Sequence, residues 1–231
     1  MLVEAATTPA DLERMVERRV AGDPLEVIVG WAEFCGLHIV VEPGVFVPRR
    51  RTELLVAQGI VLASATSVVV DMCCGSGAVG AALLASRPEL QLYAADIEPA
   101  AVRCARKNIG SRGHVVEGDL FEPLPAALRG RVDIVVANAP YVPTDAIALM
   151  PPEARIHEPQ VALDGGSDGL DIQRRVAAEA PHWLAPGGHL LIETSERQAP
   201  ATADAFARAG FVTRVVHSDD LDGTVVIGTL R

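Results

Sequence analysis

The stretch VVVDMCCGSGAVG, residues 68–80, decides the fold of this chain. A run of β-branched residues ends at Asp71, and the glycine pattern of Gly75, Gly77 and Gly80 then opens an alanine-rich segment. The apolar run predicts a buried strand, the glycines predict a tight turn, and the alanine-rich segment predicts a helix. A strand, a glycine-rich loop and a helix in this order are typical of the start of a doubly wound α/β sheet.

Strand-like and helical runs alternate from this stretch to the end of the chain. Short runs of Val, Ile and Leu between helices indicate parallel strands covered on both faces. The last two strand-like runs have a turn and no helix between them, which predicts an antiparallel hairpin at one edge. We therefore expect an α/β fold with a doubly wound, mostly parallel, seven-stranded sheet. The seven runs are SVVVDM (67–72), LQLYAAD (90–96), HVVEGDL (114–120), VDIVVAN (132–138), HLLIETS (189–195), FVTRVVHSDD (211–220) and GTVVIGTLR (223–231).

The residues before the predicted sheet do not show the alternation of strands and helices. Residues 8–22, TPADLERMVERRVAG, have a Thr-Pro start, early acids and a Gly stop, which predicts a helix. Residues 36–48, GLHIVVEPGVFVP, are strand-like with a Pro-Gly turn inside them. We expect residues 1–45 to form a short helix-plus-strand appendage and residues 46–231 to form the main domain.

Composition narrows the class of protein. The formal net charge of −10 disfavours broad binding to nucleic acid, which usually needs a basic surface. No apolar run is long enough to span a bilayer, and the N-terminal residues lack the apolar core of a secretory signal. The cysteines show no spacing typical of a metal site or a disulfide framework, so we expect reduced thiols and no metal. A soluble cytoplasmic protein without a membrane partner is the expectation. The four cysteines are Cys35, Cys73, Cys74 and Cys104.

The glycine loop and the acids that follow the strands predict a nucleotide-like cofactor. Asp96 ends the second strand 21 residues after Gly75, where an acid can accept hydrogen bonds from ribose hydroxyls. A dinucleotide and S-adenosylmethionine both fit this pattern. Asp71 and Asp119 favour S-adenosylmethionine, since one could hold its ammonium group and the other its adenine amine. Leu120 could cover the adenine face. The candidate cofactor-binding residues are Asp71, Cys73, Gly75, Gly77, Asp96, Ile97, Asp119, Leu120 and Asn138.

Simpler interpretations of the same residues stay open. The glycines can form a tight turn without any ligand, Asp96 can cap a helix, and Asp119 can belong to an ordinary turn.

The tetrapeptide Asn138-Ala139-Pro140-Tyr141 follows the fourth predicted strand, at the sheet edge where ligands bind in this fold. The side-chain carbonyl of Asn138 and the backbone carbonyl of Ala139 can each accept a hydrogen bond from one NH2 group. Pro140 biases Ala139 toward an extended conformation, and Tyr141 can stack on a flat amide or base. Two acceptors facing one planar NH2 suit methylation at nitrogen, so these four residues are the catalytic candidates. Satisfying a turn is the alternative role of Asn138.

These residues resemble the glutamine-specific protein methyltransferases of the HemK/PrmC family, in which the tetrapeptide is usually Asn-Pro-Pro-Tyr. The segment VFVPRRRTELLV, residues 45–56, is similar to the family segment before the cofactor fold, with Pro48, Arg49, Thr52 and Glu53 at matching positions. Residues 154–172, ARIHEPQVALDGGSDGLDI, resemble the family region after the tetrapeptide, and DLDGTVVIGTLR resembles its closing strand. The resemblance covers about residues 23–231.

The resemblance implies a class I methyltransferase fold and an S-adenosylmethionine-dependent N-methyltransferase. It further implies that the substrate is the side-chain amide of a glutamine in a peptide chain release factor or a related protein. It does not address the oligomeric state.

Three features depart from the family pattern. Ala139 replaces a proline, which leaves the backbone carbonyl but no longer locks φ. Arg50 stands where proline is commoner, within a basic run that is either a solvated helix start or a contact to an acidic partner. The N-terminal segment is shorter than the helical bundle that helps family members recognise the release factor.

Other polar residues have weaker claims. His157 could act as a base, although a surface or packing role is expected for it, and it shares its loop with Glu158 and Asp164. His189 and Glu193, on the fifth predicted strand, are expected to serve structure or the capping of the strand end.

Three other functions remain as alternatives. The first is methylation of an exocyclic amine in DNA or RNA, against which the net charge counts. The second is cofactor binding without catalysis, and the third is a nicotinamide-dependent enzyme.

Overall fold

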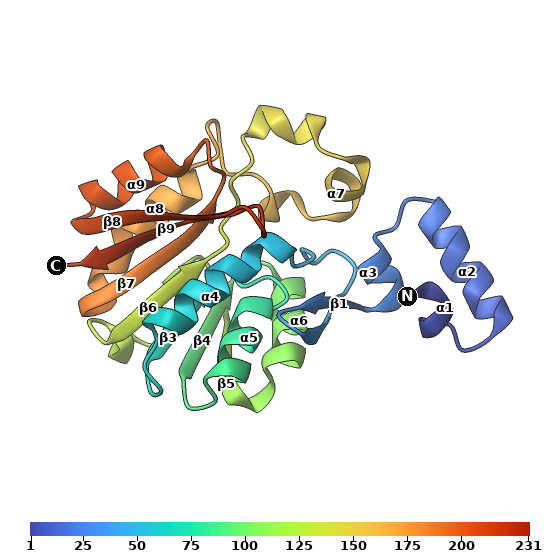
Figure 1. The fold of residues 1–231 in the computed structure, drawn as a ribbon, viewed down its shortest axis with the longest axis horizontal. Coiled ribbons are helices and arrows are strands. Elements are labelled where there is room, and N and C mark those ends of the chain that lie inside the picture. Colours follow the sequence, from blue (N-terminus) through green and yellow to red (C-terminus); the bar gives the residue numbers. More distant parts are fainter.

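The computed structural model describes residues 1–231, and its centre is a seven-stranded sheet with the order β5-β4-β3-β6-β7-β9-β8 (Figure 1). All strands run parallel except β9, which is antiparallel to both β7 and β8. The predicted fold class, with its antiparallel hairpin at the edge, is confirmed. The strands are β3 (Val68–Met72), β4 (Gln91–Asp96), β5 (Gly113–Glu117), β6 (Val132–Ala137), β7 (Leu184–Thr194), β8 (Phe211–Ser218) and β9 (Gly223–Leu230).

Helices cover both faces of this sheet (Figure 1). Val69 packs on one face with α4, α5 and α6, whereas Val68, Val70 and Met72 pack on the other with α8 and α9. This division follows from the strand period of two, since successive side chains point to opposite faces. Both faces are apolar, as the continuous hydrophobic runs predicted. The helices are α4 (Glu53–Leu62), α5 (Ala78–Ser86), α6 (Pro99–Ile109), α8 (Asp171–Glu179) and α9 (Ala199–Arg208).

The strand order reverses between β3 and β6. From β3 the chain moves outward through β4 to β5, and it then returns to place β6 on the other side of β3. Open α/β sheets bind ligands beyond the carboxyl ends of the strands at such a point. The residues that follow β3 and β6 are therefore brought together at one edge of the sheet.

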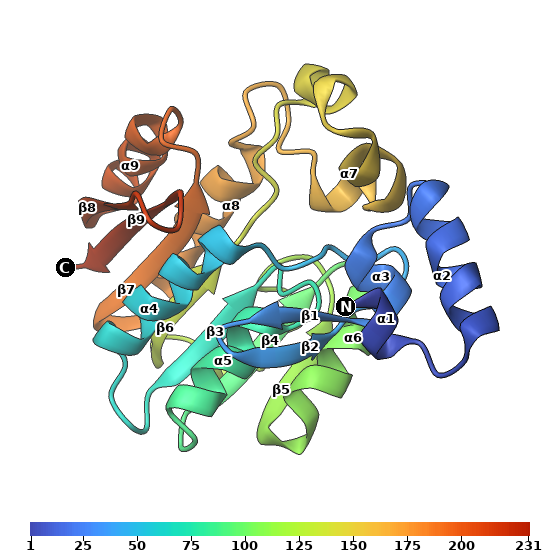
Figure 2. The same ribbon diagram turned by 45° about the vertical axis from the view of Figure 1, so that its right-hand side comes forward.

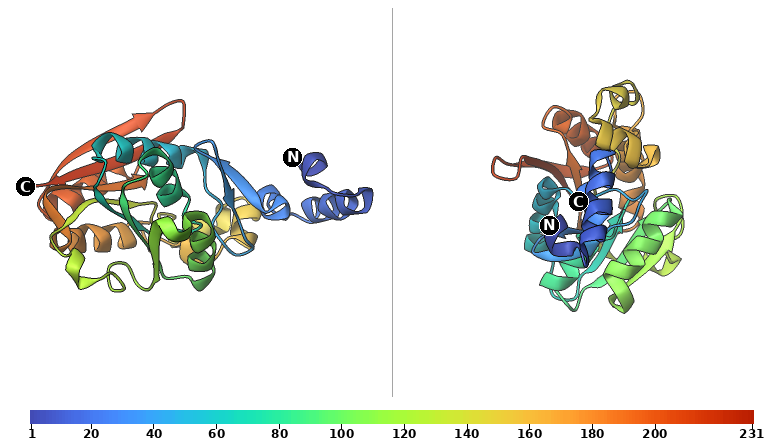
Figure 3. Two further views of the ribbon diagram at one scale, coloured as in Figure 1. Left: turned by 90° about the horizontal axis from the view of Figure 1, so that it is seen from below. Right: turned by 90° about the vertical axis from the view of Figure 1, so that its right-hand side faces the viewer.

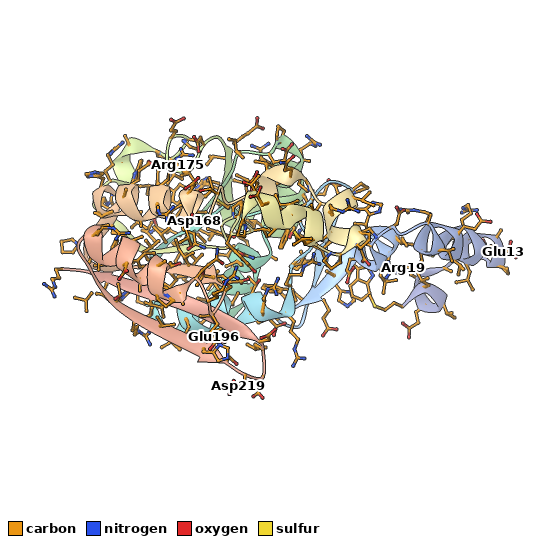
Figure 4. The ribbon with its side chains drawn as sticks, turned by 90° about the horizontal axis from the view of Figure 1, so that it is seen from above. Glu13, Arg19, Asp168, Arg175, Glu196 and Asp219 are labelled. Atoms are coloured by element: carbon orange, nitrogen blue, oxygen red, sulfur yellow. The ribbon has the colours of Figure 1, made fainter.

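The N-terminal segment begins with three helices, α1 (Leu2–Ala5), α2 (Pro9–Val20) and α3 (Leu25–Val29). The helix expected within residues 8–22 forms as α2, with Pro9 in its first turn and the Thr8 side chain accepting a hydrogen bond from the Asp11 amide. Helices α1 and α2 project away from the sheet (Figure 3), and Glu13 lies near their far tip (Figure 4).

A two-stranded hairpin joins these helices to the main body (Figure 2). It pairs β1 (Trp31–Phe34) with β2 (Leu37–Val40), so the strand-like run of residues 36–48 forms a strand only in its first part. The sequence analysis did not predict β1. Phe34 and Ile39 of the hairpin are buried in the same core cluster as α4 and α5. The division of the chain at residue 45 stays a prediction.

No helix is both long enough and apolar enough to cross a membrane.

The closing strand generates a stability prediction. A Cβ added to Gly228 in β9 would lie 2.7 Å from Cδ2 of Phe206 and 2.9 Å from Phe211. Overpacking of this kind costs about 1–3 kcal/mol, more than the modest gain from replacing a strand glycine. We expect Gly228→Ala to lower the free energy of unfolding by about that amount, measured by urea denaturation.

Val215→Ala is the control for this experiment, because Val215 lies on the neighbouring strand β8 and is half exposed. An unchanged or raised urea midpoint for Gly228→Ala would contradict the prediction.

Candidate active site

A pocket lies at the carboxyl ends of β3, β4, β5 and β6, at the reversal of the strand order. It brings together the predicted cofactor and catalytic residues with one exception. Gly77 does not line the pocket. The predicted residues that line it are Asp71, Cys73, Gly75, Asp96, Ile97, Asp119, Leu120, Asn138, Ala139, Pro140 and Tyr141.

The glycine loop joins β3 to α5 in a tight turn. Gly75 and Gly77 have φ values of 54° and 76°, in the left-handed region that favours glycine. A Cβ on Gly77 would lie 3.0 Å from the backbone of Ala105 in α6. Gly77 therefore allows the loop to pack against α6, whereas Gly75 borders the pocket itself.

Asp96 ties the end of β4 to the glycine loop. One carboxylate oxygen accepts a hydrogen bond from the Gly75 amide at 2.8 Å, and the other accepts one from the Glu98 amide at 2.9 Å. Burial raises the pKa of Asp96, and these hydrogen bonds oppose that effect. Each oxygen keeps a second lone pair, so the carboxylate can still accept hydrogen bonds from a pair of hydroxyl groups.

Asp71 is a buried acid without a cationic partner. Its side chain accepts a hydrogen bond from the Gly80 amide at 2.9 Å and is 2% exposed. Burial, with a further contribution from the negative charge of Asp96, raises the pKa of Asp71 to about 8. A positively charged group placed in the pocket would stabilise the ionised form of this carboxyl.

Asp119 and Leu120 follow β5 on the same side of the pocket. Asp119 accepts a hydrogen bond from Arg175 of α8 at 2.7 Å, and the two residues form an ion pair. Leu120 is buried with a φ of 47°, while Ile97 remains about half exposed. One oxygen of Asp119 is therefore already engaged by Arg175, a pocket residue that the sequence analysis did not identify.

Asn138 directly follows β6. Its side-chain amide donates a hydrogen bond from Nδ2 to Oγ1 of Thr52 at 3.3 Å, and its Oδ1 atom accepts none from the protein. Ala139 is buried beside it, and Tyr141 is partly buried. Burial, followed by the nearby charge of Glu193, raises the pKa of Tyr141 to about 12, so the phenol stays neutral.

The chain after the tetrapeptide is held by a buried glutamine. Gln198 donates from Nε2 to the backbone carbonyls of Tyr141 and Asp168, both at 3.0 Å, and Ser195 donates to its Oε1 at 2.6 Å. A Cβ on Gly169 would lie 2.3 Å from the Tyr141 carbonyl oxygen. Gln198 thus fixes the backbone at Tyr141, and Gly169 leaves room for it; the sequence analysis assigned a role to neither.

The basic run before α4 turns two of its three arginines toward buried acids. Arg49 forms an ion pair with Glu158, and Nε of Arg51 lies 3.5 Å from Oε1 of Glu193. Arg50 is exposed in the 3₁₀ turn η1 (Arg50–Thr52). A solvated helix start therefore describes Arg50, whereas Arg51 is exposed but paired with Glu193.

The remaining polar candidates lie outside the pocket, except Glu158. Nδ1 of His157 is 3.7 Å from Asp23, near where Arg19 of α2 pairs with Glu153 of α7 (Pro152–His157) at 3.1 Å. Figure 4 shows Arg19 on the side of α2 toward the main body. These contacts connect the N-terminal segment to the loop after the tetrapeptide.

Asp164 and His189 have local structural partners. Asp164 accepts hydrogen bonds from the Thr144 hydroxyl at 2.7 Å and the Gly166 amide at 3.0 Å. His189 lies 3.0 Å from the hydroxyl of Thr229 on β9.

Comparison with known proteins gives this site its context. The family model described as Methyltransferase small domain matches residues 36–166. The release factor glutamine methyltransferase of Geobacter sulfurreducens is 41% identical over 200 residues, covering 85% of this chain and 69% of that protein. The chain belongs to the release factor glutamine methyltransferase family. The resemblance inferred from the tetrapeptide and its flanking segments is confirmed.

A second relative agrees with this membership, and a solved structure shares the fold. The family member from Mycolicibacterium smegmatis is 39% identical over 220 residues, covering 93% of this chain and 76% of that protein. A methyltransferase from Pyrococcus furiosus shares the fold with a TM-score of 0.64 at 16% identity, covering 94% of this chain and 98% of that one.

Members of the release factor glutamine methyltransferase family use S-adenosylmethionine, and the pocket suits that cofactor. The buried Asp71 carboxyl faces no cation of the protein, which fits an ammonium group. Gly75 brings bare backbone to the pocket wall, and Asp96 can accept from ribose hydroxyls. Leu120 and Ile97 supply apolar surface for a flat base.

The raised pKa of Asp71 generates a prediction about the methyl donor. Asp71 is mostly protonated in the free protein at pH 6.5, since its pKa is about 8. An ammonium group bound beside it lowers that pKa, so binding releases a proton and the affinity rises with pH between about 5.5 and 7. The α-amino group of the donor stays charged in this range, because its ordinary pKa is about 8.

Calorimetric titration of the donor in buffers of different ionisation enthalpy measures this proton. We expect close to one proton released by the natural protein and none by Asp71→Asn. Equal proton release by the two proteins would assign the proton to another group.

Proposed function

We propose that this chain transfers a methyl group from S-adenosylmethionine to the side-chain amide nitrogen of a glutamine in a peptide chain release factor. The observation that carries this proposal is the position of Asn138 and Ala139 in the wall of the pocket that suits the donor. The names of its relatives, which are release factor glutamine methyltransferases, support the substrate.

The donor's side of the pocket holds and aligns a charged molecule. When bound, S-adenosylmethionine supplies an electrophilic methyl group on a positively charged sulfur. Asp71 would hold its ammonium group, and Asp96 would hold its ribose. Asp119 would meet the adenine amine with the oxygen not engaged by Arg175, while Leu120 and Ile97 would enclose the base. Positioning of this kind supplies much of the rate acceleration when the reagent is intrinsically reactive.

The acceptor's side of the pocket addresses the weak nucleophilicity of an amide. The nitrogen lone pair of glutamine is delocalised into its carbonyl group. The two N–H groups of the amide would donate hydrogen bonds to Oδ1 of Asn138 and to the backbone carbonyl of Ala139. These hydrogen bonds return electron density to the nitrogen and stabilise the positive charge that develops there. Tyr141 would pack against the plane of the amide. The N-methylated amide then loses its extra proton to water readily, so no strong base is required.

The charge of the protein supports a protein substrate over nucleic acid. The net charge is −10, and two of the three arginines in the basic run are paired with buried acids. Binding along the phosphate backbone of a nucleic acid would need such arginines without an acidic partner in the protein. We place the reaction in the cytoplasm, with which four free thiols are compatible.

The proposal is tested with purified release factor, bulk RNA and DNA as separate acceptors of a labelled methyl group. We expect label on the release factor, located by mass spectrometry on one glutamine. Transfer to nucleic acid alone, or to none of the three, would overturn the proposed substrate.

Asn138→Ala tests the catalytic role. We expect transfer to fall by about a hundredfold or more, as when one preorganised electrostatic contact is removed from a reacting centre. Calorimetric affinity for the donor should change by no more than a few fold. Gln160→Ala, an exposed change near the same loop, is the matched control. A large loss of donor affinity with Asn138→Ala would assign the residue to the cofactor instead.

Ala139→Pro tests whether the acceptor is a backbone carbonyl. Proline preserves that carbonyl and locks φ near the value common to the family tetrapeptide. We expect the rate of transfer to be preserved or modestly raised, measured with the same labelled donor. Inactivation would show that the loop follows another course in this chain.

A further inference from the structure

Glu193 is a buried acid that the proposed chemistry does not use. It stands near the end of β7, is 1% exposed, and neither of its carboxylate oxygens accepts a fully formed hydrogen bond. Its ion-pair partner is Arg51, whose side chain is 43% exposed. A buried carboxylate left in this condition is costly, so its surroundings indicate what it does.

The hydroxyl groups of Thr52 and Tyr141 face this carboxylate. Burial is the largest effect on the pKa of Glu193 and raises it, while the Thr52 hydroxyl, the charge of Arg51 and the Tyr141 hydroxyl act in the opposite direction. Thr52 is 3% exposed and is also the residue that accepts the hydrogen bond from Nδ2 of Asn138. The series Glu193, Thr52 and Asn138 thus leads from behind the pocket to its wall, where Thr52 and Asn138 lie.

We propose that Glu193 and Thr52 are positioning residues that orient the side-chain amide of Asn138, with its oxygen presented to the substrate. This inference rests on the proposed function, because the proposed transfer needs the oxygen of Asn138, and not its NH2 group, to face the substrate.

The direction follows from counting protons. A threonine hydroxyl has one proton to donate, and an ionised carboxylate can only accept. If the Thr52 proton is directed to Glu193, its oxygen offers only lone pairs to Asn138. Those lone pairs attract the NH2 of the amide and repel its oxygen. Oδ1 of Asn138 is then free for the substrate.

The opposite orientation would disable the site. It would direct the NH2 of Asn138 into the pocket, where two N–H groups would face the N–H groups of the substrate amide. The carbonyl and the NH2 of an asparagine side chain have nearly the same shape, so packing alone does not choose between them. In its ionised form beside Arg51, Glu193 fixes the direction of the hydrogen bonds and so makes that choice.

Three substitutions separate this role from ordinary packing. Thr52→Val keeps the shape of the side chain and removes the hydroxyl, whereas Thr52→Ser keeps the hydroxyl. Glu193→Gln keeps the shape and supplies an NH2 that can donate to Thr52, which permits the reversed direction. Thr194→Val is the control, because Thr194 is buried next to Glu193 but bonds to Thr202.

Steady-state methylation of release factor gives the first readout. We expect kcat to fall about tenfold or more in Thr52→Val and Glu193→Gln, with the KM for the donor within about twofold. Thr52→Ser and Thr194→Val should keep at least roughly half of kcat. The double variant Thr52→Val/Glu193→Gln should have a kcat no lower than that of the less active single variant, because the effects of residues that act through one another do not add.

The side-chain NH2 signal of Asn138 in a nitrogen-15 NMR spectrum gives the second readout, without substrate. It is assigned by its loss in Asn138→Ala. We expect it to move in Thr52→Val and Glu193→Gln and to stay in place in Thr52→Ser.

Several results would overturn the inference. One is a kcat of Thr52→Val within about threefold of that of the natural protein. Another is a loss of kcat in Thr52→Ser equal to that in Thr52→Val. The third is a double variant whose loss of kcat is the product of the losses in Thr52→Val and Glu193→Gln. If Glu193→Gln does not fold, the two Thr52 variants decide. If the natural protein does not methylate release factor, the proposed function fails, and an NMR signal that is unmoved in Thr52→Val then overturns the orienting role by itself.

Discussion

The parallel pairing of β3 with β6 is the constraint on which the rest of the site depends. Its register places Asp71 opposite Val136 and Met72 opposite Ala137, so the residues after the two strands leave the sheet side by side. The glycine loop and the tetrapeptide are about sixty residues apart in sequence. They meet because β4 and β5 were added on the far side of β3 before β6 returned. The donor and the acceptor can therefore be held in one pocket without a second domain.

The buried acids around this edge of the sheet differ in the groups that stabilise their negative charge. Burial raises the pKa of Asp71, Glu158 and Glu193. Glu158 has Arg49 and Glu193 has Arg51, but Asp71 has only the backbone of α5. Asp71 and Glu158 both line the pocket, but Arg49 already pairs with Glu158, so Asp71 is the one left to face a cationic ligand. The other two fasten the segment before α4 to the loop after β6 and to the end of β7.

The fold and the cofactor side of the site could be predicted from the sequence because their signals are local. A strand, a glycine loop and an acid at the next strand end lie within a few tens of residues, and each has a fixed meaning in this fold. Asn138 stood out for the same reason. Gln198, Arg175 and the hydroxyl of Thr52 could not be placed in this way, because their partners are 30 to 86 residues distant and depend on tertiary packing. Glu193 was predicted to be a strand-end residue. Its neighbours at the site are Arg51, Thr52 and Tyr141, which are far from it in sequence and reach it only through the tertiary fold.

The position of Glu193 along the chain affects the order in which the parts of the site come into being during synthesis. The strands and loops that line the donor pocket are complete once α8 has been made, at Glu179. The carboxylate behind Asn138 follows only with β7, and Gln198, which holds the Tyr141 carbonyl, follows later still. A growing chain thus contains every residue of the donor pocket before it contains Glu193 and Gln198. The segment from β7 to the start of α9 therefore supplies contacts to a site whose pocket lining precedes it in the chain.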